Sequence, residues 1–234
     1  MKKTIFTLCL SIFVAMGIAS AQQIEASENR KTDSFNALKI NGAINVELIA
    51  SSVEDIKIST IGIEPSEVLV EVKNGELIID LLKKKNVSYN RKMSVKAVIS
   101  YKAMQSIRIN GTGSVKSAQT LKSENIALEI SGTGSIKLAL ASENLQANIS
   151  GTGSMNLIGS TNNATIIVSG TGSFDGNEIT VNSAKVDLRG TGSIKIGTSQ
   201  QISGSLSGVG SIRYKGSPSV NVTKTGMGSI KQSN

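Results

Sequence analysis

The sequence contains no histidine, no tryptophan and a single cysteine, Cys9, among its 234 residues. Without histidine, a Ser-His-Asp triad, an imidazole general base and a histidine metal site are all excluded. One cysteine cannot form an intramolecular disulfide or a thiolate metal cluster. Aromatic residues make up only 3% of the chain, which argues against the stacking of nucleic-acid bases. The sequence therefore predicts no cofactor and no nucleic-acid partner.

Long apolar segments are also scarce, and the one that is present lies at the N-terminus. Lys2 and Lys3 precede the apolar run Ile5–Ile18, and the small residues of Ala19–Ala21 follow it. This order is typical of a secretory signal peptide, and the run is shorter than the ~20 residues that a membrane-spanning helix needs. We predict a signal peptide over residues 1–21, whose cleavage also removes Cys9. No second run of spanning length follows, so the chain is expected to be exported and to have no transmembrane segment after cleavage.

Glycine, in contrast, is abundant and periodic. The tetrad Gly-x-Gly-Ser occurs seven times, at spacings of 18 to 21 residues, and holds 14 of the 23 glycines. The tetrads begin at Gly111, Gly132, Gly151, Gly170, Gly190, Gly208 and Gly226. A fixed period of about 19 residues indicates a repeat architecture rather than a flexible linker.

Around each tetrad, every second residue is apolar or glycine, as in Leu145, Ala147, Ile149, Gly151 and Gly153. This alternation is typical of strands and not of helices. A repeat of about 19 residues is too short for a four-stranded propeller blade, but it suits one coil of a parallel β-helix, or β-solenoid, with two or three short strands and tight corners. Equivalent residues of neighbouring coils should then lie ~4.8 Å apart.

Such stacking predicts columns of like residues, and the sequence contains them. The tetrad serines form an unbroken column: Ser114, Ser135, Ser154, Ser173, Ser193, Ser211 and Ser229. Asn125, Asn144 and Asn163 form a second column, seven residues before their tetrads. We interpret these columns mainly as structural ladders that hold the coils in register. The tetrad glycines either point into a narrow interior or supply corner angles that other residues avoid, and the sequence leaves both alternatives open.

The first half of the chain is less regular. Residues 35–110 alternate as strands do, and Asn74-Gly75 indicates a hairpin turn. We predict degenerate β coils and a cap over 35–110, continuous with a regular solenoid over 111–234. Residues 22–34 are polar and are expected to be mobile, and the basic stretch 83–93 is expected to be an exposed loop.

A column of mostly basic residues is the strongest candidate for a binding site. The residues that follow the first apolar position after each tetrad are Lys116, Lys137, Asn156, Asp175, Lys195, Arg213 and Lys231. Stacked cations repel one another unless an anion lies over them. An acidic glycan or another polymer of the cell envelope could bind the five cations of this column. The alternative is a charged edge that prevents aggregation.

Paired carboxylates are the remaining candidates for catalysis. Glu129 and Asp187 share a repeat position but are three coils, or about 14 Å, apart, which is too far for the ~5 to ~9.5 Å of glycoside hydrolysis. Glu124 and Glu143 lie in adjacent coils and are interpreted as solvated residues of a turn. We therefore predict no catalytic and no metal-binding residue. A carbohydrate-active enzyme on a β-helix and a purely structural envelope protein stay open as alternatives.

The run from Ile40 to Leu48, the segment Gly75–Ile79 and the serial Ser-Gly-Thr-Gly-Ser motifs resemble the family called putative auto-transporter adhesin, head GIN domain, over about residues 35–230. The resemblance implies a right-handed parallel β-helix in an exported protein of a Gram-negative bacterium, which is periplasmic, on the outer surface or secreted. It also suggests an adhesive binding module, by analogy. We further expect a homo-oligomer, because the last coil has no evident cap.

Overall fold

The structure is a computed structural model that describes residues 25–82 and 93–233. The predicted signal peptide and nearly all of the predicted loop at 83–93 lie outside the described residues. The described chain is almost entirely β-sheet, with one short 3-10 helix, η1 (Pro65–Glu67). Among the described residues there is no helix that is long and apolar enough to span a membrane.

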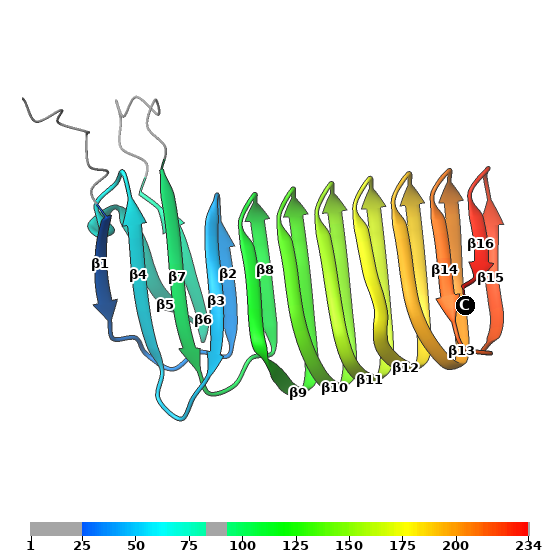
Figure 1. Cartoon of the computed structure of the whole chain (residues 1–234), viewed down its shortest axis with the longest axis horizontal. Helices are drawn as coiled ribbons and strands as arrows, with labels where there is room; N and C mark the ends of the chain where they lie inside the picture. Colours follow the sequence, from blue (N-terminus) through cyan, green and yellow to red (C-terminus); the bar gives the residue numbers. More distant parts are fainter. Residues whose placement is uncertain (1–24, 83–92, 234) are drawn as a thin grey trace, which may run out of the picture.

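The repeat region is a β-solenoid, as the periodicity predicts (Figure 1). Five windings each consist of one long strand: β9 (Ser114–Gly132), β10 (Ser135–Gly151), β11 (Ser154–Gly170), β12 (Ser173–Gly190) and β13 (Ser193–Gly208). The next residues form the shorter strands β14 (Ser211–Lys215), β15 (Ser219–Thr225) and β16 (Ser229–Gln232). Neighbouring strands pair in parallel with like residues opposite one another. Each winding is thus one bent strand rather than the two or three short strands that the sequence suggests.

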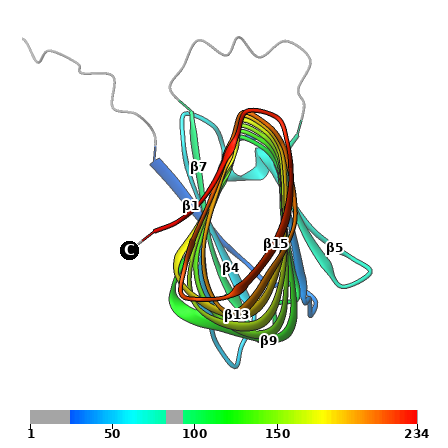
Figure 2. The same ribbon diagram turned by 90° about the vertical axis from the view of Figure 1, so that its right-hand side faces the viewer.

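Every long strand runs down one side of the solenoid, turns at a rounded base and returns along the other side to a narrow edge (Figure 2). We name the two sides by their strands. Face A contains β3 (Ile44–Ala50), the first parts of β9 to β13, β14 and β16. Face B contains β2 (Ala37–Asn41), β8 (Ser106–Gly111), the last parts of β9 to β13, and β15.

The Gly-x-Gly-Ser tetrads lie at the narrow edge of the solenoid. The structure requires glycine at the two positions of each tetrad for different physical reasons. Gly151 has φ of +115°, and a Cβ atom on it would lie 2.5 Å from the carbonyl oxygen of Gly132. Gly153 is buried, and a Cβ atom on it would lie 2.5 Å from Cγ2 of Ile130. The first glycine therefore supplies the corner angle, and the second leaves room for the core. Both alternatives that the sequence left open are realised, one at each glycine.

Alternation buries one apolar column beneath each face. On face B this column runs through windings from both halves of the chain: Ile40, Ile109, Ile130, Ile149, Val168, Leu188 and Leu206. All seven side chains are fully buried, and full burial of one such side chain contributes about 1.5–3 kcal/mol. One core therefore continues from the N-terminal half through the repeats.

The N-terminal half extends both faces with mixed pairing. Beyond β3, face A continues through β7 (Ser94–Tyr101), β4 (Asp55–Ile61) and β1 (Glu25–Arg30). Beyond β2, face B continues through β6 (Glu76–Leu81) and β5 (Val68–Lys73). The pairs β1/β4, β4/β7 and β5/β6 are antiparallel. Within residues 35–110, the expected degenerate coils are represented by β2, β3 and β8, which pair in parallel with their neighbours. The antiparallel pairs depart from this expectation, because antiparallel strands cannot continue a solenoid winding.

Part of the segment 22–34, for which the sequence predicts mobility, forms a strand in the structure. Residues 25–30 form β1, which pairs over its whole length with residues 56–61 of β4. The guanidinium of Arg30 donates hydrogen bonds to the carbonyl oxygens of Val68 (2.6 Å) and Pro65 (2.7 Å). The strand is polar because it lies at the edge of the sheet, so its sequence carries no apolar signal.

Candidate cationic binding surface

The seven tetrad serines stand in one column on face A, each opposite its equivalent in the next winding. In the described chain, no hydrogen bond joins one of these serines to the next. Only Ser114 has a side-chain partner, since its hydroxyl donates to Oδ1 of Asn45 at 2.6 Å. Backbone pairing and core packing, rather than serine contacts, therefore hold the register here. The predicted asparagine column does form a ladder, because the side chains of Asn125, Asn144 and Asn163 are joined by hydrogen bonds between windings. The hydroxyls of the later serines are left available to water or to a ligand.

The column of mostly basic residues also lies on face A, two residues beyond the serines. Its members stand opposite one another in the predicted order, and Glu47 of β3 precedes Lys116. Carboxylates neutralise part of the positive charge of this column. Lys116 lies 3.6 Å from Glu47, which also bonds Lys96 at 3.0 Å. The hydrogen bond from Lys96 and the charge of Lys116 hold the pKa of Glu47 below its usual value. Lys195 is paired with Asp175 at 3.1 Å.

Three of the five predicted cations have no carboxylate partner among residues 25–82 and 93–233. These are Lys137, Arg213 and Lys231. Arg213 and Lys231 follow Lys195 in consecutive windings, and Lys215 stands two residues beyond Arg213 on the same face. We call Lys195, Arg213, Lys215 and Lys231 the C-terminal cationic cluster. Sequence analysis missed Lys215, although alternation along the strand places it outward, as it does Arg213.

The spacing of this cluster follows from sheet geometry. Equivalent residues in neighbouring windings are ~4.8 Å apart, and Arg213 and Lys215 are ~6.6 Å apart along their strand. Two unit charges about 5 Å apart repel by about 1 kcal/mol in water. Asp175 is the one acidic side chain that pairs with a member of the cluster in the described chain. The cluster therefore presents an excess of positive charge beside the hydroxyls of Ser193, Ser211 and Ser229.

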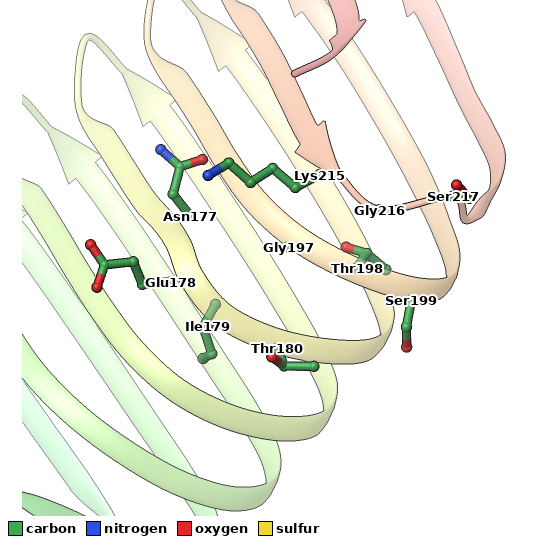
Figure 3. Close-up of a pocket in the computed structure, with 10 residues that line it drawn as sticks. All are labelled: Asn177, Glu178, Ile179, Thr180, Gly197, Thr198, Ser199, Lys215, Gly216 and Ser217. Atoms are coloured by element: carbon green, nitrogen blue, oxygen red, sulfur yellow. The ribbon is translucent and has the colours of Figure 1, made fainter. Parts of the chain in front are cut away.

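A cavity of about 450 Å³ adjoins the cluster near the base of the solenoid. Figure 3 shows the side chain of Lys215 extending from β14 toward Asn177, which lies in β12. The hollow forms where the register between β12 and β13 shifts, between Gly176 and Thr180. Thr198 lines this cavity but is buried, and its buried hydroxyl has no hydrogen-bond partner among the described residues. Lys215 thus belongs both to the cationic cluster and to the cavity.

Most of the acidic residues considered for catalysis form hydrogen bonds or ion pairs with other side chains. Asp187 accepts a hydrogen bond from Ser205 at 2.7 Å, and Glu143 accepts one from Asn162 at 2.6 Å. Glu129 lies 3.7 Å from Arg108. A further acidic residue, Glu178, lines the cavity beside the cationic cluster. In the described part of the chain, no group of three or more carboxylates or cysteines could hold a metal ion.

A further carboxylate, Glu54, lies at the N-terminal end of the solenoid. Its side chain is 7% exposed. It accepts hydrogen bonds from the Ser34 hydroxyl (2.8 Å) and the Phe35 amide (3.4 Å), and Lys102 is 3.3 Å away. Burial acts to raise the pKa of Glu54, but these donors outweigh it and the pKa is lowered. This arrangement ties the segment before β2 to the loops of face A.

Solved structures of similar shape support the fold. A protein described as a "putative adhesin" from Bacteroides fragilis NCTC 9343 is 26% identical, with a TM-score of 0.81 over 90% of this chain and 97% of that one. Another "putative adhesin", from Parabacteroides merdae ATCC 43184, is 20% identical, with a TM-score of 0.71 over 90% and 96%. A "putative lipid binding protein" from Parabacteroides distasonis ATCC 8503 is 19% identical, with a TM-score of 0.73 over 90% and 97%.

The two Parabacteroides proteins are only 20% and 19% identical in sequence, so their similarity concerns the fold alone. No protein with a curated description matches the sequence significantly. A family model does match, over residues 34–218, a range that holds both faces of the solenoid and most of its windings. On this match the chain belongs to the family described as putative auto-transporter adhesin, head GIN domain.

Proposed function

We propose that this protein is a non-catalytic, exported binding module that holds an acidic glycan or another anionic polymer of a cell envelope against the C-terminal cationic cluster. The observation that carries the proposal is the stack of Lys195, Arg213 and Lys231 in consecutive windings, of which only Lys195 has a carboxylate partner in the described chain. The family name and the names of the similar structures, which describe adhesins, agree with a binding role. The signal peptide predicted over residues 1–21 agrees with export.

A polymer suits this surface better than a small anion does. The cations recur at the strand spacing of ~4.8 Å along the solenoid axis, so a chain of regularly spaced anionic groups can contact several of them at once. The serine column runs parallel to the cations and offers hydroxyl donors to the same chain. Because the surface is exposed, each ion pair contributes only about 0.2–1 kcal/mol, and useful affinity requires several contacts together.

The test is the binding of immobilised polygalacturonate, with dextran as the uncharged comparison, at about 0.05 M and about 0.5 M salt. We expect the protein to bind polygalacturonate at low salt and to lose most of this binding at high salt. The double variant R213Q/K231Q should bind about 2- to 30-fold more weakly, since it removes two exposed ion pairs.

The matched control is K137Q, which removes an unpaired cation from the same column but outside the cluster. It should change binding less than the double variant does. Absence of binding at low salt, or equal binding by the wild type and R213Q/K231Q, would overturn the proposal.

A further inference from the structure

The opposite face of the solenoid carries a second concave surface of different chemistry. A groove of about 520 Å³ lies where the strands of face B begin, near the base. Its polar walls are formed by Gln105, Asn125, Asn144, Asn163, Gln146 and Thr165. We call it the amide groove. None of the residues that line it is charged, so the anionic polymer proposed above has no counter-charge there.

Ala127 is the smallest residue that lines the groove. Ala127 lies opposite Gln146 in the next winding, and Thr165 follows in the winding after that. In the preceding winding Ala127 lies opposite Ser106, so two short side chains stand side by side before the longer Gln146. Gln105, whose carbonyl oxygen accepts a hydrogen bond from the Ala127 amide, lines the N-terminal end of the groove. The volume of the groove falls within the ~300–1,000 Å³ that is usual for ligand sites.

The amides along one wall are held in fixed orientations by one another. Asn163 Nδ2 donates to Asn144 Oδ1 at 3.0 Å, and Asn144 Nδ2 donates to Asn125 Oδ1 at 2.9 Å. At the N-terminal end of the groove, Asn36 Nδ2 donates to Gln105 Oε1 at 3.1 Å. An ordered amide loses little side-chain entropy when it binds a ligand, because its rotamer is already fixed.

The ladder leaves hydrogen-bonding capacity unused. Each side-chain amide has two N–H donors and an oxygen that accepts two bonds. Within the described chain, the amide nitrogen of Asn125 and the oxygen of Asn163 have no partner, and neither do the side chains of Gln146 and Thr165. Donors and acceptors therefore alternate over a few ångströms on one uncharged wall. Hydroxyl groups, which donate and accept equally, match such a wall better than anions or cations do.

From these observations we propose that the amide groove is a second binding site, which takes the hydroxyl groups of a neutral sugar chain. A chain is favoured over a single sugar because the amides recur in three consecutive windings, at ~4.8 Å intervals. No aromatic side chain lines the groove, so the ring stacking that strengthens many sugar sites is missing. We therefore expect dissociation constants near the millimolar range.

The experiment uses two probes, cellohexaose and β-1,4-mannohexaose, titrated to about 10 mM into the purified protein. Binding is measured from amide chemical shifts in NMR spectra. The test variant is A127Q, which fills the hollow with the side chain found one winding further on, so that the fold should tolerate it. The control is A118Q, the same substitution at an exposed alanine outside the groove.

At least one probe should bind the wild type and A118Q equally and should bind A127Q about tenfold more weakly or not at all. Binding should be the same at low and high salt and in R213Q/K231Q, which separates this site from the cationic cluster. The proposal is overturned if neither probe binds, if A127Q binds as the wild type does, or if R213Q/K231Q abolishes binding. None of these results decides whether polygalacturonate binds face A, so the two proposals fail independently.

Discussion

The close approach of the tetrad glycines to the preceding winding predicts how alanine is tolerated at three positions. Gly151→Ala combines an unfavourable φ of +115° with a Cβ atom 2.5 Å from the Gly132 carbonyl oxygen. Gly153→Ala has no positive φ, but its Cβ atom would lie 2.5 Å from a methyl group of Ile130 and 2.9 Å from the Gly134 carbonyl oxygen. Gly42→Ala is the matched control, because its φ is +86° but nothing lies within 4 Å of its Cβ position.

The magnitudes follow from separating the two effects. A side chain held at a left-handed φ costs of order 1–3 kcal/mol, and overpacking costs about 1–3 kcal/mol. Replacement of glycine also restricts the unfolded chain, which stabilises the fold by about 0.4–1 kcal/mol. Gly151→Ala bears both costs and should lose about 1–6 kcal/mol. Gly42→Ala bears the first alone and Gly153→Ala the second alone, so each should lose about 0–3 kcal/mol.

The assay is urea denaturation followed by circular dichroism, with the melting temperature as a second measure. A difference of 1 kcal/mol shifts the melting temperature by about 2–4 °C in a chain of this size. Gly151→Ala should therefore melt several degrees below Gly42→Ala. Equal losses in these two variants would refute the reasoning, because they would show that contact between windings adds nothing to the backbone strain.

Two further outcomes follow from other parts of the solenoid. The folded state lowers the pKa of Glu54 from 4.5, so its contribution to stability is present above about pH 4.5 and is lost as the pH falls further. The loss of stability caused by Glu54→Gln should therefore shrink between pH 7 and pH 3, and a constant loss would contradict the assignment. In the described chain no strand pairs with the outer edges of β15 and β16, and Val220 and Met227 are 41% and 87% exposed there. We propose that these edges pair with a second copy. Light scattering should then show a mass that rises with concentration, less so in Met227→Lys, whereas a strict monomer at high concentration would contradict this.

The solenoid could be predicted because its evidence is local. The interval between tetrads fixes the winding length, and alternation such as Leu145, Ala147 and Ile149 fixes which side chains point inward. Together they set the register between neighbouring windings. The interior column beneath face B is the direct result, since an apolar residue recurs at the same repeat position.

The N-terminal half could not be predicted in the same way. Its antiparallel pairs join segments that share no repeat, and the sequence does not indicate which strand pairs with which. The polar strand β1 has no apolar alternation, and the bonds from Arg30 to the backbone of Pro65 and Val68 follow from tertiary structure alone. For the same reason the position of Glu47 beside Lys116 was not foreseen, because Glu47 precedes the first tetrad.

The position of Glu47 beside Lys116 changes how the column of basic residues is interpreted. Sequence analysis treats the five cations of the column alike, although they fall into two groups, Lys116 with Lys137 and Lys195 with Arg213 and Lys231. In the structure, Lys116 of the first group lies against Glu47, which also contacts Lys96, while Lys137 has no carboxylate partner among the described residues. The second has one carboxylate, Asp175, for the four cations of the C-terminal cationic cluster. A charged edge that only prevents aggregation would need no such difference between its two ends, whereas a site for an anionic chain requires the excess of positive charge to be concentrated in one place.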